Sequence, residues 1–160
     1  MVAPFRLLFV CLGNICRSPA AEGVMRALIE AEGLADHVII RSAGTGGWHV
    51  GKLPDQRMRA AARNRSYDLC SRARQVTEDD LRHYDLVLVM DRQNLRDVRS
   101  YDRAALFSSK VRLFCEFCTS HQETEVPDPY YGGEQGFELV LDLLEDGCRG
   151  VLEHIRSALA

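Results

Sequence analysis

The sequence predicts an α/β fold with three layers, in which a four-stranded parallel sheet carries helices on both faces. Short, continuously apolar runs alternate along the chain with helical patterns, and such runs are typical of strands buried on both faces of a parallel sheet. The alternation implies right-handed crossovers between the strands. The chain has 160 residues and shows no repeat, low-complexity tract or linker, so we expect a single domain over residues 1–160.

Four runs are expected to form the strands. The clearest is 86–89, which reads LVLV and contains no polar residue. Each run is short, and a helical segment lies between it and the next, as a parallel sheet requires. The expected strands are residues 5–10, 37–42, 85–90 and 110–114.

Helix start and stop signals frame the segments between the strands. Ser18 is expected to cap the first helix, with Pro19 in its first turn and Gly33 at its end. Thr77 begins a short helix with a capping-box pattern, and Asp91 is placed to cap another. The remaining helices are expected at residues 54–64, 92–99 and 134–159, the last with a middle weakened by Gly147 and Gly150.

Composition excludes two classes of partner. The formal net charge is −3, and Lys and Arg are scattered among acids, whereas nucleic-acid binders normally carry a basic stripe. No apolar run approaches the roughly 18 residues that span a bilayer. We therefore expect no nucleic acid, no membrane association and a cytoplasmic location.

The six cysteines are expected to be reduced thiols, for which catalytic or metal roles outrank a disulfide framework in a cytosolic chain. Cys115, Cys118 and His121 resemble half of a zinc site. A fourth ligand at zinc-site spacing is missing, so the favoured interpretation is two semi-buried thiols at a strand end.

The segment 11–18, CLGNICRS, follows the first expected strand and leads into a helix. A helix N-terminus offers unpaired N–H groups and a positive dipole end, and Gly13 and Asn14 tolerate the positive φ that turns amides toward one centre. Arg17 adds a planar fork for two oxygens of a tetrahedral dianion such as phosphate. The positive end of the helix dipole and the charge of Arg17 favour the thiolate form of Cys11, and Ser18 can donate a hydrogen bond to the sulfur. A buried cysteine beside a capping turn is the alternative, but it leaves Arg17 unexplained.

Asp128 is the candidate proton donor. Expelling a phenolate, whose conjugate acid has a pKa near 10, is easier when a carboxylic acid protonates it. Pro129 restricts Asp128 to an extended conformation that projects its carboxyl group from the loop. An ordinary Asp-Pro turn with partly exposed aromatic residues remains the alternative for this motif taken alone.

Together these motifs resemble the low-molecular-weight protein tyrosine phosphatases, and the resemblance covers nearly the whole chain. The longest matching stretch, residues 9–23, contains the phosphate loop, and the matching stretch 128–133 contains Asp128 and precedes the C-terminal helix. The matching segments are FVCLGNICRSPAAEG (9–23), SAGT (42–45), Trp48, Gly51, Pro54 and Asp55, ARQ (73–75), Met90 and Asp91, Asn94 and Leu95, and DPYYGG (128–133).

The resemblance implies a division of labour among three catalytic residues. Cys11 would be the nucleophile that forms a cysteinyl-phosphate, and Arg17 would hold the phosphate and stabilise the transition state. Asp128 would protonate the leaving phenolate and then act as the base for water. It also implies that no metal and no cofactor is needed, because amides and arginine supply the electrostatics.

The resemblance also assigns substrate-binding residues. Backbone amides from the phosphate loop would complete the cradle, and aromatic side chains would wall a slot that favours phosphotyrosine over shorter phosphoserine. The cradle residues are Leu12, Gly13, Asn14, Ile15 and Cys16, with Ser18 beside them, and the slot residues are Trp48, Tyr130 and Tyr131.

Supporting roles follow from the same resemblance. The Asn14 side chain would brace the loop together with Ser42, and Ser71 stands where the family usually has a histidine that ties the loop to neighbouring serines. Asp91 would either orient Arg17 or only cap its helix. Cys16 would form a reversible disulfide with Cys11 that protects the nucleophile from further oxidation, or would pack as a small buried residue behind the loop.

The leading functional hypothesis is therefore hydrolysis of phosphotyrosine in proteins. Arsenate reduction on a related fold is a second hypothesis, but it needs further cysteines in relay and Cys70 has no clear partner before Cys115. A non-catalytic phosphotyrosine-binding module is a third, although such a module would be expected to lose the nucleophile, the arginine or the acid. The expected partner is a phosphotyrosine-containing protein, for example a tyrosine kinase, with phosphate and other oxyanions as product or inhibitors.

Overall fold

The computed structural model describes residues 3–130 and 132–160. Its sheet contains four strands in the order β2-β1-β3-β4, and every neighbouring pair is parallel. The predicted α/β fold with a parallel sheet is confirmed. The strands are β1 (Phe5–Cys11), β2 (Val38–Gly44), β3 (Leu86–Val89) and β4 (Val111–Leu113).

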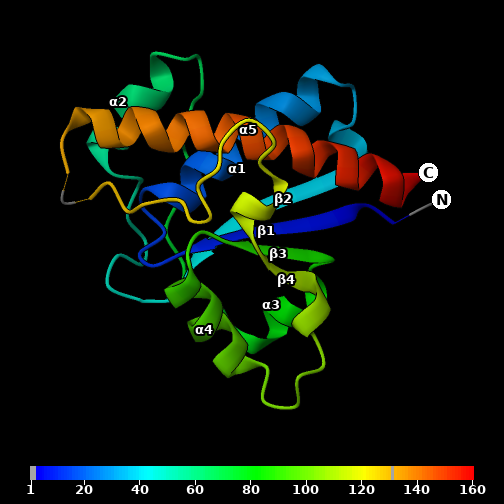
Figure 1. Ribbon diagram of the computed structural model, residues 1–160. Helices are drawn as coiled ribbons and strands as arrows, with labels where there is room; N and C mark the ends of the chain where they lie inside the picture. The colour runs from blue at the N-terminus through cyan, green and yellow to red at the C-terminus, as the bar shows by residue number, and fades with distance from the viewer. Residues whose placement is uncertain (1–2, 131) are drawn as a thin grey trace.

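Helices cover both faces of the sheet, as Figure 1 shows. One face carries α1 (Arg17–Ala31), α2 (Gln56–Arg63) and the long α5 (Glu134–Leu159), and the other carries α3 (Glu78–His83) and α4 (Arg92–Tyr101). None of the helices within the described ranges has the length and apolar character that crossing a bilayer requires. Within residues 3–130 and 132–160, three short 3₁₀ helices connect these elements: η1 (Ala35–His37), η2 (Ser108–Lys110) and η3 (Phe114–Phe117).

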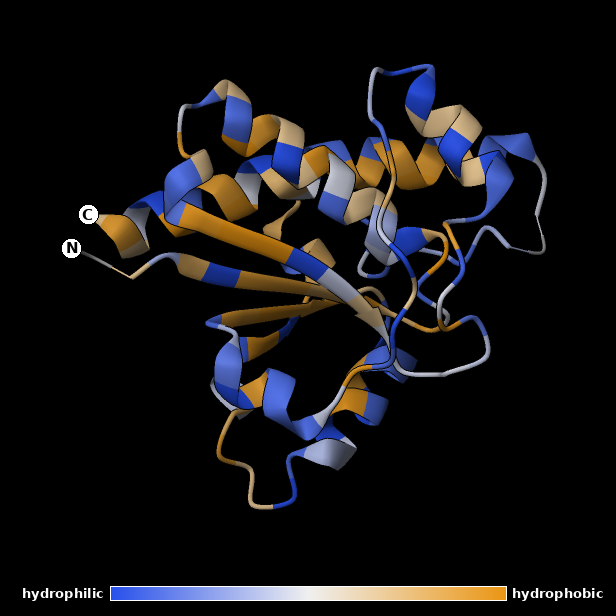
Figure 2. Cartoon of the chain, turned by 180° about the vertical axis from the view of Figure 1, so that it is seen from behind, coloured by the Kyte–Doolittle hydropathy of each residue, from blue (hydrophilic) through white to orange (hydrophobic). Residues whose placement is uncertain are grey.

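The strands are apolar because both of their faces are buried. Along β1, Leu7 and Phe9 join the cluster that contacts α1 and α5, whereas Leu8 and Val10 join the cluster on the α3 and α4 side. All four side chains are fully buried, and burying each one contributes about 1.5–3 kcal/mol. Figure 2 accordingly shows the strands mostly in hydrophobic colours.

The first helix begins differently from the sequence prediction. Ser18 does not cap it, because α1 starts at Arg17 with Cys16 at the N-cap position and no side-chain capping hydrogen bond. The Ser18 hydroxyl instead lies 3.0 Å from the Cys11 sulfur. At the other end Gly33 lies just past the helix with a φ of 71°, a conformation that suits glycine.

The predicted second helix is shorter at both ends than expected. It runs over Gln56–Arg63 because Asp55 caps it, its carboxylate accepting a 2.8 Å hydrogen bond from the Arg57 N–H. The predicted caps of the next two helices are present: Thr77 forms a capping box before α3, and Asp91 forms one before α4.

The two glycines in the middle of α5 have a packing reason. The helix is continuous over Glu134–Leu159. A Cβ at Gly147 would lie 2.2 Å from the Phe114 ring, and one at Gly150 would lie 2.0 Å from the Phe117 carbonyl oxygen. Gly147 and Gly150, which were expected to weaken the middle of α5, are therefore the positions at which η3 packs closely against the backbone of that helix.

Candidate active site

The loop between β1 and α1 is the centre of the site. Cys11 ends β1 and Arg17 begins α1, and both are buried, so the five intervening residues must turn sharply. Asn14 makes this turn with a φ of 56°. Gly44 at the end of β2 leaves room for it, because a Cβ there would lie 2.8 Å from the Leu12 carbonyl oxygen.

A chain of buried hydroxyl and amide groups lies beside the Cys11 sulfur. The Ser18 hydroxyl is 3.0 Å from Cys11 Sγ and accepts a 2.7 Å hydrogen bond from Asn14 Nδ2. The same Asn14 amide donates to Ser42 Oγ at 3.0 Å, and Ser42 donates to Glu22 Oε1 at 2.6 Å. Ser18 and Asn14 are thus held in one orientation beside the sulfur.

Two features of this network differ from the sequence-based expectation. Glu22 is 4% exposed, and its carboxylate closes the network, although sequence reasoning did not select it. An acidic residue one helical turn after Ser18, on the buried face of the predicted helix, was the available signal. Ser71 takes no part: within the described residues its side chain has no hydrogen-bond partner, and the Arg74 N–H donates to Asn14 Oδ1 at 3.0 Å instead.

Arg17 is fixed from two directions. Its Nη1 donates to Asp91 Oδ2 at 2.7 Å and to the Val126 carbonyl at 3.0 Å, and its Nη2 lies 3.5 Å from Asp128 Oδ2. Burial by itself would lower the pKa of Arg17, but the Cys11 and Asp91 groups raise it above its ordinary value. The guanidinium therefore stays charged in a buried position.

Asp91 performs both of the roles that the sequence left as alternatives. Its Oδ1 accepts a 2.8 Å hydrogen bond from the Asn94 N–H and so caps α4. Its Oδ2 is the oxygen that contacts Arg17. One carboxylate joins the start of a helix on one face of the sheet to the arginine at the start of a helix on the other.

Asp128 lies at the mouth of the site with a half-exposed side chain. Its Oδ1 accepts a 3.0 Å hydrogen bond from the Tyr130 N–H, which orients the carboxyl group across Pro129. Its Oδ2 is the oxygen closer to Arg17. The long segment that follows η3 thus brings the candidate acid to the carboxyl end of β1.

Cys11, Arg17 and Asp128 line one pocket of about 400 Å³. Trp48 and Tyr130 form its walls, with 69% of Trp48 exposed to solvent. Tyr131, the third predicted wall residue, lies outside the described residues. The pocket is lined by Cys11, Leu12, Gly13, Ile15, Cys16, Arg17, Trp48, His49, Asp128 and Tyr130.

His49 is a pocket residue that sequence reasoning missed. Its ring centroid lies 6.3 Å from that of Tyr130, and its Nδ1 is buried with no hydrogen-bond partner in the described part of the chain. Its position next to Trp48 was the available signal. Arg57 supports the same wall: its guanidinium lies 5.5 Å from the Tyr130 ring centroid and donates to the Tyr130 carbonyl at 2.9 Å.

Comparison with known proteins identifies the family. The family model described as low molecular weight phosphotyrosine protein phosphatase matches residues 6–159. The chain belongs to this family. The phosphatase is therefore a hydrolase of phosphotyrosine, with the parallel α/β fold that the family shares.

Individual relatives agree with this assignment over most of their length. The chain is 47% identical over 154 residues to a candidate low molecular weight protein-tyrosine-phosphatase of Synechocystis, covering 96% of this chain and 98% of the relative. It is 37% identical over 151 residues to the low molecular weight phosphotyrosine protein phosphatase of Sus scrofa, covering 94% and 95%. A crystal structure of protein tyrosine phosphatase from Entamoeba histolytica superposes with a TM-score of 0.92 at 40% identity, covering 98% of this chain and 99% of that one.

Cys16 of the phosphatase lines the pocket but differs from Cys11 in its surroundings. Burial, followed by the negative charge of Asp55, raises the pKa of the Cys16 thiol far above its ordinary value. Cys16 is therefore a neutral thiol in the pocket beside Cys11.

The cysteines near the end of the sheet do not gather metal ligands. The His121 imidazole turns toward Asp146, with its Nδ1 2.8 Å from Asp146 Oδ2. Across residues 3–130 and 132–160, no group of three or more His, Cys, Asp and Glu side chains is placed to hold a metal ion.

Proposed function

We propose that the phosphatase hydrolyses phosphotyrosine in proteins, and aryl phosphates, through a cysteinyl-phosphate on Cys11 with Asp128 as general acid and base. One observation carries this proposal. Cys11 and Arg17 lie at the two ends of the β1–α1 loop, and Asp128 comes from a distant part of the sequence, yet all three line one pocket at the carboxyl ends of the strands, which is where ligands bind in open α/β sheets.

In the first step the Cys11 thiolate attacks phosphorus and the bond to the phenolic oxygen breaks. Arg17 and the loop amides hold the equatorial oxygens, whose charge they stabilise at no reorganisation cost because they are already oriented. Asp128 gives its proton to the leaving phenolate. The tyrosine hydroxyl then leaves the slot.

In the second step Asp128, now a carboxylate, accepts a proton from water. The water oxygen attacks phosphorus, the S–P bond breaks, and inorganic phosphate forms. Cys11 leaves as a thiolate, which the Ser18 hydroxyl stabilises by a hydrogen bond across the observed 3.0 Å contact. No metal or cofactor takes part in this scheme.

The slot supports selectivity for an aromatic ester. Trp48 and Tyr130 stand at the mouth while the sulfur lies at the end of β1, so a phosphorylated side chain must be long enough to pass between the rings. Phosphate and other oxyanions would occupy the same cradle as product or inhibitors. The Entamoeba histolytica structure has Hepes, a sulfonate, in its active site.

We propose that the substrate is a phosphotyrosine-containing protein, for example a tyrosine kinase. We also propose that the enzyme is cytoplasmic. The location is proposed because the six cysteines are free thiols, which a reducing compartment keeps reduced. Arsenate reduction receives no support from the relatives described above, whose names are those of phosphatases.

The deciding experiment compares aryl phosphate hydrolysis by wild type, Cys11→Ser and Asp128→Ala. Cys11→Ser is expected to abolish turnover, and Asp128→Ala to slow release of a basic phenolate by about 10²- to 10⁴-fold, the usual scale for loss of a general acid. The loss in Asp128→Ala should shrink as the leaving phenol becomes more acidic. Cys70→Ser, which changes an exposed thiol, is the matched control and should keep wild-type rates. Full turnover in Cys11→Ser would rule out the mechanism.

A second experiment addresses Cys16, for which we propose a reversible disulfide with Cys11 that protects the nucleophile. Mild peroxide treatment followed by reductant should restore the activity of the wild type. Cys16→Ala should lose activity irreversibly, because the Cys11 sulfenic acid then has no resolving thiol and oxidises further. Equal recovery of the two proteins would contradict the proposal and leave Cys16 as a packing residue.

A further inference from the structure

Cys115 and Cys118 are two thiols that the phosphatase mechanism does not use. They belong to the segment FCEF-C, in which η3 covers Phe114–Phe117 and Cys118 follows directly. In a 3₁₀ turn, side chains three residues apart eclipse one another. The Cys118 N–H donates to the Cys115 carbonyl at 3.2 Å, which closes the turn between them.

This turn holds the two Cα atoms at a spacing that a disulfide tolerates. Residues i and i+3 of a tight turn lie less than about 7 Å apart, and disulfides bridge Cα atoms about 4.4–6.8 Å apart. Because side chains three residues apart eclipse one another on a 3₁₀ turn, the two thiols lie on the same side of η3.

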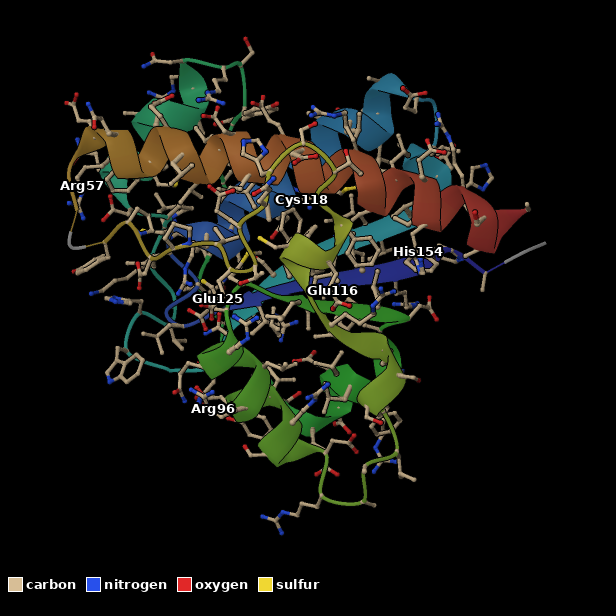
Figure 3. All side chains as sticks on the ribbon, viewed as in Figure 1. Arg57, Arg96, Glu116, Cys118, Glu125 and His154 are labelled. Carbon is tan, nitrogen blue, oxygen red and sulfur yellow. The ribbon has the colours of Figure 1, made fainter. Side chains whose placement is uncertain are left out.

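The two thiols differ in environment. Cys115 is buried, whereas Cys118 is partly exposed beside α5, where its Sγ donates to the Leu143 carbonyl at 3.6 Å (Figure 3). The neighbouring Cys118 side chain lowers the pKa of Cys115 below its ordinary value in spite of burial. The pair thus combines a more acidic thiol with a partly exposed neighbour, an arrangement suited to oxidation.

The neighbouring side chains of His121 and Asp146 are hydrogen-bonded to each other and not to the two thiols. His121 is engaged with Asp146, which also accepts hydrogen bonds from the N–H groups of Thr119, Ser120 and His121. The residues immediately after Cys118 are thereby fixed to α5. Cys148, the next cysteine along α5, is fully buried.

We propose that Cys115 and Cys118 form a second redox site, separate from Cys11 and Cys16, that a peroxide converts into an intramolecular disulfide. The two thiols supply two electrons and two protons. The S–S bond forms, the O–O bond of hydrogen peroxide breaks, and both oxygens leave as water. A thiol reductant returns the pair to the reduced state and is itself oxidised to a disulfide.

The test uses the full chain carrying Cys11→Ser, Cys16→Ser and Cys70→Ser, so that only Cys115, Cys118 and Cys148 remain. The protein is treated with hydrogen peroxide, denatured and alkylated. Before alkylation, we expect the oxidised protein to be lighter than the untreated protein by two hydrogens. After alkylation, we expect the label on Cys148 alone. Dithiothreitol should reduce the disulfide and reverse both changes. Circular dichroism of each variant before oxidation establishes that it is folded.

Glu116 lies between the two cysteines and makes the linkage directly readable. A protease that cleaves after glutamate separates residue 115 from residue 118, so after digestion only a disulfide holds their two peptides together. We expect this linked pair after oxidation and separate peptides after reduction. Cys115→Ser and Cys118→Ser in the same background are the matched controls, and neither should lose two hydrogens.

Three results would overturn the proposal. The first is alkylation of both Cys115 and Cys118 after peroxide, and the second is a disulfide that joins either of them to Cys148. Conversion of the pair to sulfinic acids without a disulfide would count equally against it, because an adjacent thiol should resolve a sulfenic acid first.

Discussion

At the scale of the residue, Ser18 shows how position within a helix can change the role of a side chain. Ser and Pro at the start of an apolar helical pattern normally indicate an N-cap. Here the helix begins two residues earlier, with Cys16 at the N-cap, so the Ser18 hydroxyl lies within the first turn, fully buried beside Cys11 Sγ and the Ala43 carbonyl. Its single proton is available to the sulfur when Cys11 is a thiolate.

Ser18→Ala is expected to slow breakdown of the cysteinyl-phosphate, because Cys11 then leaves without a hydrogen-bond donor. Hydrogen bonds to charged groups contribute about 1.5–3 kcal/mol, which corresponds to roughly 10- to 150-fold in rate. Rapid mixing with an aryl phosphate should show a burst of phenol followed by slow turnover. Ser42→Ala leaves the contact between Ser18 and Cys11 in place, so it should slow breakdown of the cysteinyl-phosphate less than Ser18→Ala does. Wild-type turnover in Ser18→Ala would show that the contact has no catalytic role.

At the scale of the element, α5 carries glycines that look unfavourable and are required by packing. Glycine in a helix interior costs about 0.5–1 kcal/mol relative to alanine. The Phe117 carbonyl nevertheless occupies the space where a Cβ of residue 150 would lie. Since that obstacle is backbone, a rotamer change cannot relieve it.

Gly150→Ala is therefore expected to destabilise the protein by about 1–3 kcal/mol, the usual cost of overpacking. Urea unfolding monitored by circular dichroism measures the difference. Gly136→Ala in the same helix is the matched control: a Cβ there meets Pro129 Cβ at an ordinary 3.5 Å. It should be neutral, or stabilising by up to about 1 kcal/mol. If Gly150→Ala were also stabilising, η3 would not pack against the helix as described.

At the scale of the whole molecule, Asp146 joins the long helix to the segment that leads to Asp128, the proposed general acid. It is fully buried in α5, and its two oxygens accept hydrogen bonds from three successive N–H groups, those of residues 119–121. Burial by itself would raise the pKa of Asp146, but these N–H groups and His121 lower it well below its ordinary value. The folded state therefore favours the ionised carboxylate.

Asp146→Asn is expected to reduce the free energy of unfolding near neutral pH by about 1–3 kcal/mol. Because the folded pKa lies below the unfolded one, the stabilisation is fully present above the ordinary value of 3.8 and is lost as the pH falls through the folded pKa. Urea unfolding at successively lower pH should show the gap between wild type and variant closing in acid. Asp142→Asn, an exposed carboxylate of the same helix, should change stability by only about 0–1 kcal/mol. A gap that is independent of pH would contradict the role of the charge.

The sequence by itself determined the strands, the position of Cys11 and Arg17 at a strand-to-helix turn, and the helix caps at Thr77 and Asp91. These features depend on local hydrophobic pattern and on hydrogen bonds between residues close in the chain.

Only the tertiary structure decided which side chains meet across the sheet. Glu22 joins the loop network because β2 brings Ser42 beside α1, and His49 faces the pocket because its segment folds back over the β1–α1 loop. Asp91 reaches Arg17 because β3 pairs with β1 and brings α4 to the same edge. Such contacts depend on distances between residues far apart in the chain, and a local pattern carries no information about them.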